Sequence, residues 1–167
     1  MGTTALIPVE EYLRTSYTDG DREYVDGEVL QRNVGEVTHS DLQRRFIIFF
    51  WIHYRDYWVS PEPRVQVSQT RFRVPDVAVI PGPMPSTSII RTPPHIVIEV
   101  LSPDDLATYM HKKVADYLAF GIPYVWVIDP QTREAWIHTS HGMQPATDGV
   151  LRAQSPDIEV PLAELFA

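Results

Sequence analysis

Two carboxylates occupy positions of the sequence where an acidic side chain is costly. Glu99 lies in the middle of the apolar run HIVIEVL, residues 95–101, and Asp76 follows Pro75 in the run VPDVAVI. An ionised carboxylate inside a dry strand costs several kcal/mol unless it is paired or binds a metal. Both faces of the Glu99 strand are apolar, so this acid cannot simply face solvent. The alternatives are a Glu99 that reaches a backbone N–H or an arginine, and an Asp76 that belongs to an ordinary edge strand.

A lysine is the third candidate site residue, and its position in the predicted helix that follows Glu99 is what selects it. Lys113 lies three residues after Met110 and four before Tyr117, so it falls within the apolar stripe of that helix and points toward the sheet. Lys112 lies off the stripe, on the side of Asp116, with which it can pair at i, i+4. The alternative is that Lys113 buries its stem and keeps its ammonium in water.

Two strand carboxylates and one inward lysine are what metal-assisted phosphodiester hydrolysis requires. Asp76 and Glu99 would hold Mg²⁺ or Mn²⁺, since hard divalent cations prefer oxygen ligands and keep bound water. Lys113 would orient the nucleophile or stabilise the negative charge on phosphorus. The alternative is a non-catalytic binding or assembly module in which the same three side chains form a buried ion-pair cluster. A hydrolase of another phosphodiester, such as a nucleotide, is a third hypothesis.

The elements around Glu99 and Lys113 form the clearest pattern in the sequence. Residues 95–101 are a strand buried on both faces, residues 103–120 a helix that ends at Gly121, and residues 124–129 a second buried strand. Strand, helix and strand in this order make a βαβ crossover with two parallel strands. A further strand, REAWIHTS, returns beside them, and PLAELFA forms a last turn of helix. The expected fold class is therefore α/β, a mixed sheet with helices on its faces.

The first half of the chain supplies two helices and a hairpin. A short helix begins near Pro8, and REYVDGEVL turns on Asp26-Gly27, the pair that a type I′ turn favours. A helix over residues 39–54, capped by Thr38 or Ser40, is apolar nearly all round. Such a helix is expected to be buried by the sheet and by a second subunit.

Alternating patterns predict two more strands, over residues 64–68 and 72–80, joined by a turn at Gln69-Thr70. The segment PGPMPSTSIIRTPP, residues 81–94, contains five prolines, which exclude helix and central strand. It is expected to be a surface loop that joins two strands.

Composition limits the class of protein. The 167 residues suit one domain, residues 1–167, and 44% of them are hydrophobic. The net charge of −8 argues against a broad, non-specific grip on a phosphate backbone. A local basic rim could relieve this objection, with Arg44, Arg45, Arg71, Arg73 and Arg91 as its members. The absence of cysteine excludes disulfides, thiolate zinc sites and thiol nucleophiles.

Nothing in the sequence predicts a membrane partner. No apolar run reaches the length of about 18 residues that spans a bilayer. The first residues show no basic stretch followed by an apolar segment, so we expect no signal peptide and a cytoplasmic location.

The chain resembles a known family over most of its length. The matching segments are VEEYL, REYVDGEVL, His39, VPDVAVI, IVIEVLSPD, KKVADYLAFGIPYVWVIDP and PLAELF, in this order. They are similar to the Uma-two family of restriction-endonuclease-like proteins, within the PD-(D/E)XK nuclease superfamily. No single segment is specific for this family, but the series of segments in this order is specific for it.

The resemblance implies a restriction-endonuclease-like core and a Mg²⁺-dependent endonuclease acting on DNA. It assigns the aspartate of the motif to Asp76 and its acid to Glu99, while the usual lysine, two residues after the acid, is replaced by Leu101. In this family the lysine is expected on the following helix, which gives the role to Lys113 and agrees with the helical phase. The resemblance adds Glu23 as an outer acid and His39 at a helix start; their alternatives are a cross-strand charge and a backbone hydrogen bond. Cleavage of both strands of a duplex would favour a homodimer.

Overall fold

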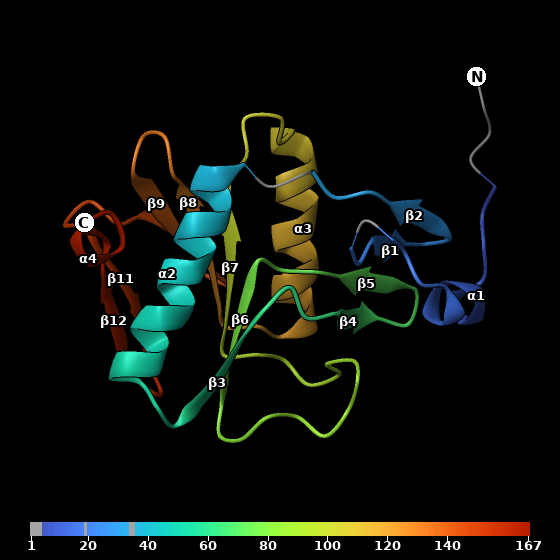
Figure 1. Ribbon diagram of the computed structural model, residues 1–167, viewed down its shortest axis with the longest axis horizontal. Coiled ribbons are helices and arrows are strands. Elements are labelled where there is room, and N and C mark those ends of the chain that lie inside the picture. Colours follow the sequence, from blue (N-terminus) through green and yellow to red (C-terminus); the bar gives the residue numbers. More distant parts are fainter. Residues whose placement is uncertain (1–4, 19, 34–35) are drawn as a thin grey trace.

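A six-stranded mixed sheet forms the centre of the protein (Figure 1). The structure is a computed structural model that describes residues 5–18, 20–33 and 36–167. The sheet has the order β10-β9-β8-β7-β6-β3. In chain order its strands are β3 (Tyr57–Pro61), β6 (Val77–Pro81), β7 (Ile96–Val100), β8 (Tyr124–Asp129), β9 (Glu134–Thr139) and β10 (Gly142–Pro145). β7 and β8 are parallel, as the crossover predicts, and the remaining neighbours in this sheet are antiparallel.

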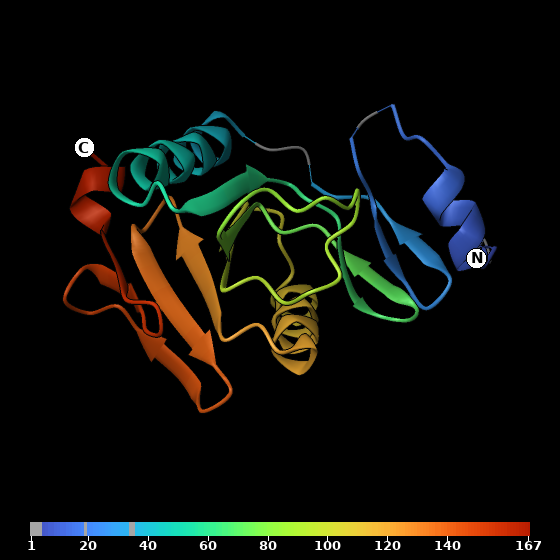
Figure 2. The same ribbon diagram turned by 90° about the horizontal axis from the view of Figure 1, so that it is seen from below.

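Two long helices cover opposite faces of this sheet (Figures 1 and 2). They are α2 (Val37–His53) and α3 (Ala107–Phe120). In β7, Ile96, Ile98 and Val100 pack in the core beneath α2, whereas Val97 packs in the core beneath α3. Since strand side chains alternate, Glu99 lies on the α3 face, as the sequence predicts. The fold class, a mixed sheet flanked by helices with a βαβ unit in its second half, is confirmed.

A smaller antiparallel sheet, of order β2-β1-β5-β4, stands beside the large one (Figure 2). Its strands are β1 (Glu23–Val25), β2 (Glu28–Leu30), β4 (Val65–Ser68) and β5 (Arg71–Arg73), and α1 (Val9–Arg14) packs against it. Asp26 and Gly27 have φ angles of 50° and 102°, which is the left-handed pair of a type I′ turn. The predicted hairpin is therefore confirmed.

The strand expected over residues 72–80 is wrong, because the chain changes sheets within it. β5 pairs with β1 and β4 in the small sheet, whereas β6 pairs with β3 and β7 in the large sheet. Pro75 lies between them and has no N–H for a strand ladder. Residues 74–76 therefore form a short crossing segment, and Asp76 occupies its end.

Helix α2 also differs from expectation at its start and on its surface. It begins at Val37 after Glu36, with no side-chain cap, so Thr38 and Ser40 lie inside its first turn rather than capping it. One face packs on the sheet through Leu42, Phe46, Phe49 and Phe50. The opposite face is exposed to solvent in the single chain, since the exposed fractions of Ile48, Trp51 and Ile52 are 41%, 70% and 59%.

The other expected elements are present with shifted ends. Helix α3 begins at Ala107, four residues later than predicted, and ends at Gly121, whose φ of 102° is the left-handed C-cap conformation. The loop over residues 81–94 joins β6 to β7, and its Ile90 bridges to Val65 of the small sheet.

The C-terminal elements include strands that the sequence patterns did not predict. They are β11 (Val150–Ala153) and β12 (Ile158–Pro161), which pair with each other. Two strands of the large sheet, β3 and β10, were also not predicted. The predicted last turn of helix is α4 (Leu162–Leu165), which packs in the same core as α2. Within the described ranges, no helix has both the length and the apolar character needed to cross a membrane.

Candidate active site

The three predicted residues converge on one cleft. Asp76, Glu99 and Lys113 all line a cleft of about 430 Å³, together with His39. Asp76 comes from the crossing segment, Glu99 from β7 and Lys113 from α3. The three side chains are nearly buried, with exposed fractions of 3%, 2% and 4%. They therefore form the floor of the cleft, and solvent reaches them only from its open side.

Lys113 is the centre of the charged network. Its Nζ donates to Glu99 Oε2 at 2.9 Å and to the Val74 carbonyl at 3.1 Å, and it lies 3.0 Å from Glu23 Oε1. Burial alone would lower the pKa of Lys113, but the carboxylates of Glu23 and Glu99 outweigh it and raise that pKa. Lys113 is thus a permanent cation at neutral pH. Lys112 is exposed, so the helical phase chose the inward lysine correctly.

Glu99 is held between Lys113 and a tyrosine. Its Oε1 accepts a hydrogen bond of 2.7 Å from the Tyr117 hydroxyl, and Lys113 binds its other oxygen. Burial raises the pKa of Glu99 to about 7, Lys113 opposes the shift, and the negative charges of Asp76 and Glu23 add to it. Removal of this carboxylate from water is therefore the main cause of the shift, and the neighbouring carboxylates are a smaller one.

Asp76 has partners on both carboxylate oxygens. Oδ1 accepts from Arg32 Nη2 at 2.9 Å, and Oδ2 accepts from the Val100 N–H at 2.7 Å and lies 3.1 Å from His39 Nε2. Burial opposes ionisation, but the hydrogen bond to His39 and the charges of Lys113 and Arg32 outweigh it, so the pKa of Asp76 is lowered. For His39, burial likewise opposes the charge, and its bond to Asp76 outweighs burial and raises the pKa.

Glu23 supports the site from behind rather than facing the cleft. It is fully buried and, unlike the other four predicted residues, is not part of the cleft lining. It accepts from Arg73 Nη1 at 2.8 Å and from the Val74 N–H at 2.9 Å, and the Tyr109 hydroxyl also donates to it. Burial would raise the pKa of Glu23, but Lys113 and Arg73 lower it to about 2. The outer acid of the sequence prediction is therefore a residue that positions Lys113.

One member of the expected basic rim, Arg73, is not at the surface, whereas Arg44 and Arg91 are exposed, Arg71 is partly exposed, and all three hold polar partners. Arg73 is 2% exposed and binds Asp116 as well as Glu23, and Arg71 binds Asp26 and Asp116. Asp116 is consequently a buried partner of two arginines and not a surface partner of Lys112. The other members of the supposed rim also have polar partners, with Arg44 and Arg45 on Asp41 and Arg91 on Gln66.

The carboxylates at the cleft suit a divalent cation. In the described residues, no three or more His, Cys, Asp or Glu side chains form a metal-binding group. An ion at Asp76 and Glu99 would therefore complete its coordination with water, as Mg²⁺ does when two carboxylates bind it. Both side chains line the cleft, and carboxylate oxygens are the ligands that Mg²⁺ and Mn²⁺ prefer. Arg32 occupies Oδ1 of Asp76, so it would have to turn away.

Sequence reasoning missed the residues that hold this network together. Tyr109 lies four residues before Lys113 and Tyr117 four after it, so the helical spacing that chose Lys113 also indicates these two hydroxyls. Gln43 lies four residues after His39 and donates to the Asp76 carbonyl at 2.6 Å. Arg32 follows β2 without any regular pattern, and nothing in the sequence points to it.

Comparison with known proteins places the chain in a family. A family model named Uma2, with the description "Putative restriction endonuclease", matches residues 9–164. The chain belongs to the Uma2 family. The Uma-two resemblance deduced from the sequence is thereby confirmed.

The Uma2 chain also shares its fold with a solved structure. This is the crystal structure, at 1.96 Å, of a "putative nuclease belonging to DUF820" from Anabaena variabilis ATCC 29413. The TM-score is 0.80 at 22% sequence identity, over 96% of this chain and 97% of that chain. No curated protein matches significantly.

The position of Glu23 predicts how acid destabilises this Uma2 protein. Because folding lowers its pKa from 4.5 to about 2, its contribution is complete above pH 4.5 and is lost as the pH falls toward 2. Glu23→Gln should lower the free energy of unfolding at pH 7 by about 3 kcal/mol. Urea unfolding should show that the difference from wild type shrinks between pH 5 and 3. Glu28→Gln, an exposed acid of the same hairpin, is the control; an equal loss in both variants contradicts the prediction.

Proposed function

We propose that this protein is a Mg²⁺-dependent endonuclease that hydrolyses phosphodiester bonds in DNA. The observation that carries the proposal is one cleft lined by two carboxylates, Asp76 and Glu99, and by the ammonium of Lys113, which is paired with Glu99. The family description, "Putative restriction endonuclease", supports the same reaction class. A small cleft with its own cations also suits an acidic protein, because binding then does not need a broad basic surface.

Asp76 and Glu99 would hold the ion. When bound, Mg²⁺ lowers the pKa of a coordinated water and offsets negative charge at phosphorus. Lys113 lies beside Glu99, and because its pKa is raised it would act as a positive charge and not as a base. Its ammonium already contacts Glu99, Glu23 and the Val74 carbonyl, so a hydrogen bond to substrate would replace one of these contacts. Arg32, which now binds Asp76 Oδ1, would give up that oxygen to the ion and would then be available to pair with a phosphate. His39 keeps its bond to Asp76 and holds that carboxylate in place.

The second candidate is a non-catalytic module that keeps the nuclease scaffold. One observation favours it, since all four carboxylate oxygens of Asp76 and Glu99 already have protein partners. Under this hypothesis the cluster specifies the fold and takes no metal. The two candidates therefore differ first in metal binding, before any cleavage is measured.

Metal binding and cleavage should depend on the same two carboxylates. Asp76→Asn and Glu99→Gln keep the side-chain size, so the protein should fold, but they should abolish Mg²⁺-dependent nicking of a plasmid. Titration calorimetry with Mn²⁺ should show an affinity at least ~10-fold lower in each variant. Mutation of a residue that merely hydrogen-bonds to a metal ligand already lowers metal affinity by about that factor. Wild type that binds no Mn²⁺ and cuts no DNA form with either metal would favour the module.

The two neighbouring lysines make a matched pair. Lys113→Met keeps the packing and should reduce the cleavage rate by about 100-fold or more, with a small effect on Mn²⁺ affinity. Lys112→Met changes an exposed side chain and should leave both unchanged. The variants should be compared below their unfolding temperatures, which circular dichroism gives. Equal rates for the two variants would refute the role of Lys113.

We further propose a homodimer through the open face of α2. Ile48, Trp51 and Ile52 form an apolar patch there, and a nuclease that cuts both strands needs two sites. Trp51→Glu should convert the dimer into monomer in analytical ultracentrifugation. Met84→Glu, at an equally exposed residue of the loop over residues 81–94, should not. A wild-type protein that sediments as a monomer contradicts this proposal.

A further inference from the structure

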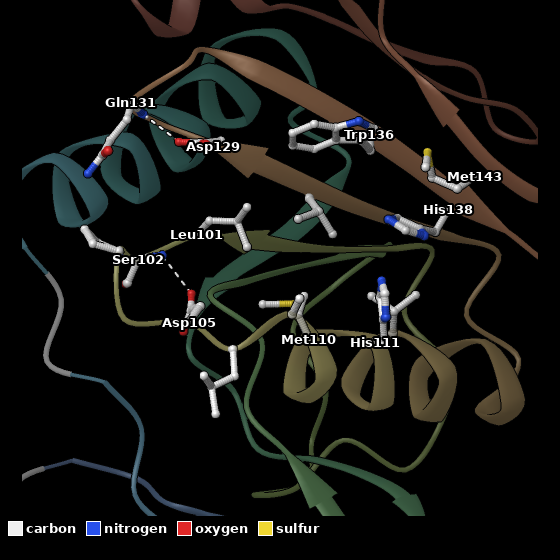
Figure 3. Close-up of a pocket in the computed structure, with 15 residues that line it drawn as sticks. Leu101, Ser102, Asp105, Met110, His111, Asp129, Gln131, Trp136, His138 and Met143 are labelled. Atoms are coloured by element: carbon white, nitrogen blue, oxygen red, sulfur yellow. Dashed lines mark hydrogen bonds between the residues drawn. The ribbon is translucent and has the colours of Figure 1, made fainter.

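A second hollow, of about 530 Å³, adjoins the candidate active site (Figure 3). It lies between α3 and strands β8, β9 and β10, and we refer to it as the α3–β9 slot. Four residues line both the slot and the cleft, namely Ser102, Asp105, Leu106 and Met110. Met110 belongs to α3, and the other three belong to the loop before it, in which Asp105 Oδ2 accepts from the Ser102 N–H at 2.7 Å. The slot and the cleft therefore share one wall, so a ligand that occupies both has to cross it.

The slot has an apolar interior and polar ends. Its interior includes a half-buried tryptophan, Trp136, and aliphatic side chains, and its apolar lining residues include Leu101, Met110, Val114, Val127 and Met143. Figure 3 shows Asp129 and Gln131 at one end and His111 and His138 at the other. A flat heteroaromatic group fits such a lining, because its faces are apolar and its edges form hydrogen bonds.

The two hollows differ in charge in one respect, because lysine and arginine side chains line only the cleft. These cations, Arg32 and Lys113, can pair with a phosphate, whereas the residues that line the slot include the carboxylates of Asp105 and Asp129 and neither lysine nor arginine. The cleft is also lined by carboxylates, namely Glu62, Asp76, Glu99, Asp104 and Asp105. Burial and the neighbouring His111 lower the pKa of His138, so this ring is neutral at pH 7 and adds no positive charge.

We propose that the α3–β9 slot binds an unpaired nucleobase while the adjoining phosphate occupies the cleft. The base stacks on Trp136, and Asp129 and Gln131 form hydrogen bonds with its edge. A base inside a duplex is stacked on both sides and can enter only after it is flipped out, so single-stranded or locally unpaired DNA is the preferred substrate. The proposal rests on the proposed nuclease function and specifies its substrate class.

The test measures binding without cleavage. A fluorescein-labelled single strand of about ten nucleotides and its matched duplex are titrated with protein in EDTA, and anisotropy gives the affinities. The single strand should bind more tightly to wild type. Met143→Glu, at the exposed rim of the slot, should weaken single-strand binding by about tenfold or more. Met84→Glu makes the same change at an exposed site outside both hollows and should have no effect.

A second variant tests the stacking surface directly. Trp136→Ala should weaken binding of the single strand by at least about tenfold and leave Mn²⁺ affinity unchanged, which also shows that the variant is folded. Equal affinity for single strand and duplex, or wild-type binding by Met143→Glu and Trp136→Ala, overturns the proposal. If slot-dependent binding persists in a protein that never cuts, only the nuclease function fails. If cleavage persists without slot-dependent binding, only the slot fails.

Discussion

The buried ammonium of Lys113 holds the two sheets of the protein together. It contacts Glu23 from the small sheet, Glu99 from the large sheet and the carbonyl of Val74 from the segment between them. Each carboxylate would be expensive to bury alone, and removing one partner of such a group is strongly destabilising. The helix that carries Lys113 therefore has one position on the sheet, and that position fixes the floor of the cleft.

The same constraint sets the electrostatics of the site. Burial of Glu99, together with the nearby carboxylates of Asp76 and Glu23, raises its pKa to about 7, and Lys113 opposes the shift. Asp76 obtains its own cations, Arg32 and His39, from the other side of the cleft. Two cations, Arg32 and Lys113, thus lie at the cleft where phosphate is proposed to bind, each paired with a carboxylate of the site.

The parts of this arrangement that follow from local patterns could be predicted from the sequence. Glu99 stood out because its strand is apolar on both faces, and Lys113 because 3.6-residue periodicity turns it toward the sheet. The parallel crossover and the Asp26-Gly27 hairpin also depend on short stretches of chain.

What depends on distant pairing could not be predicted. Arg73 alternates with its neighbours like a surface strand residue, yet Glu23 and Asp116, 50 and 43 positions away, bury it. Nothing local marks Arg32 as a partner of Asp76, 44 positions away. The chain passes from the small sheet to the large sheet at Pro75. The alternation of apolar and polar residues continues across Pro75, so the pattern does not indicate that the sheet changes there. The ion, the DNA substrate and the dimer stay predictions.

The crossing segment over residues 74–76 also limits how the chain can change length during evolution. It is extended between two strands of fixed register, and its first and last residues contact Lys113 and Arg32. One inserted residue would shift Asp76 or move β6 by a register step that turns its core side chains outward. Insertions and deletions should therefore be absent from this segment among Uma2 relatives, and should accumulate in the loop over residues 81–94 and in the turn before β11.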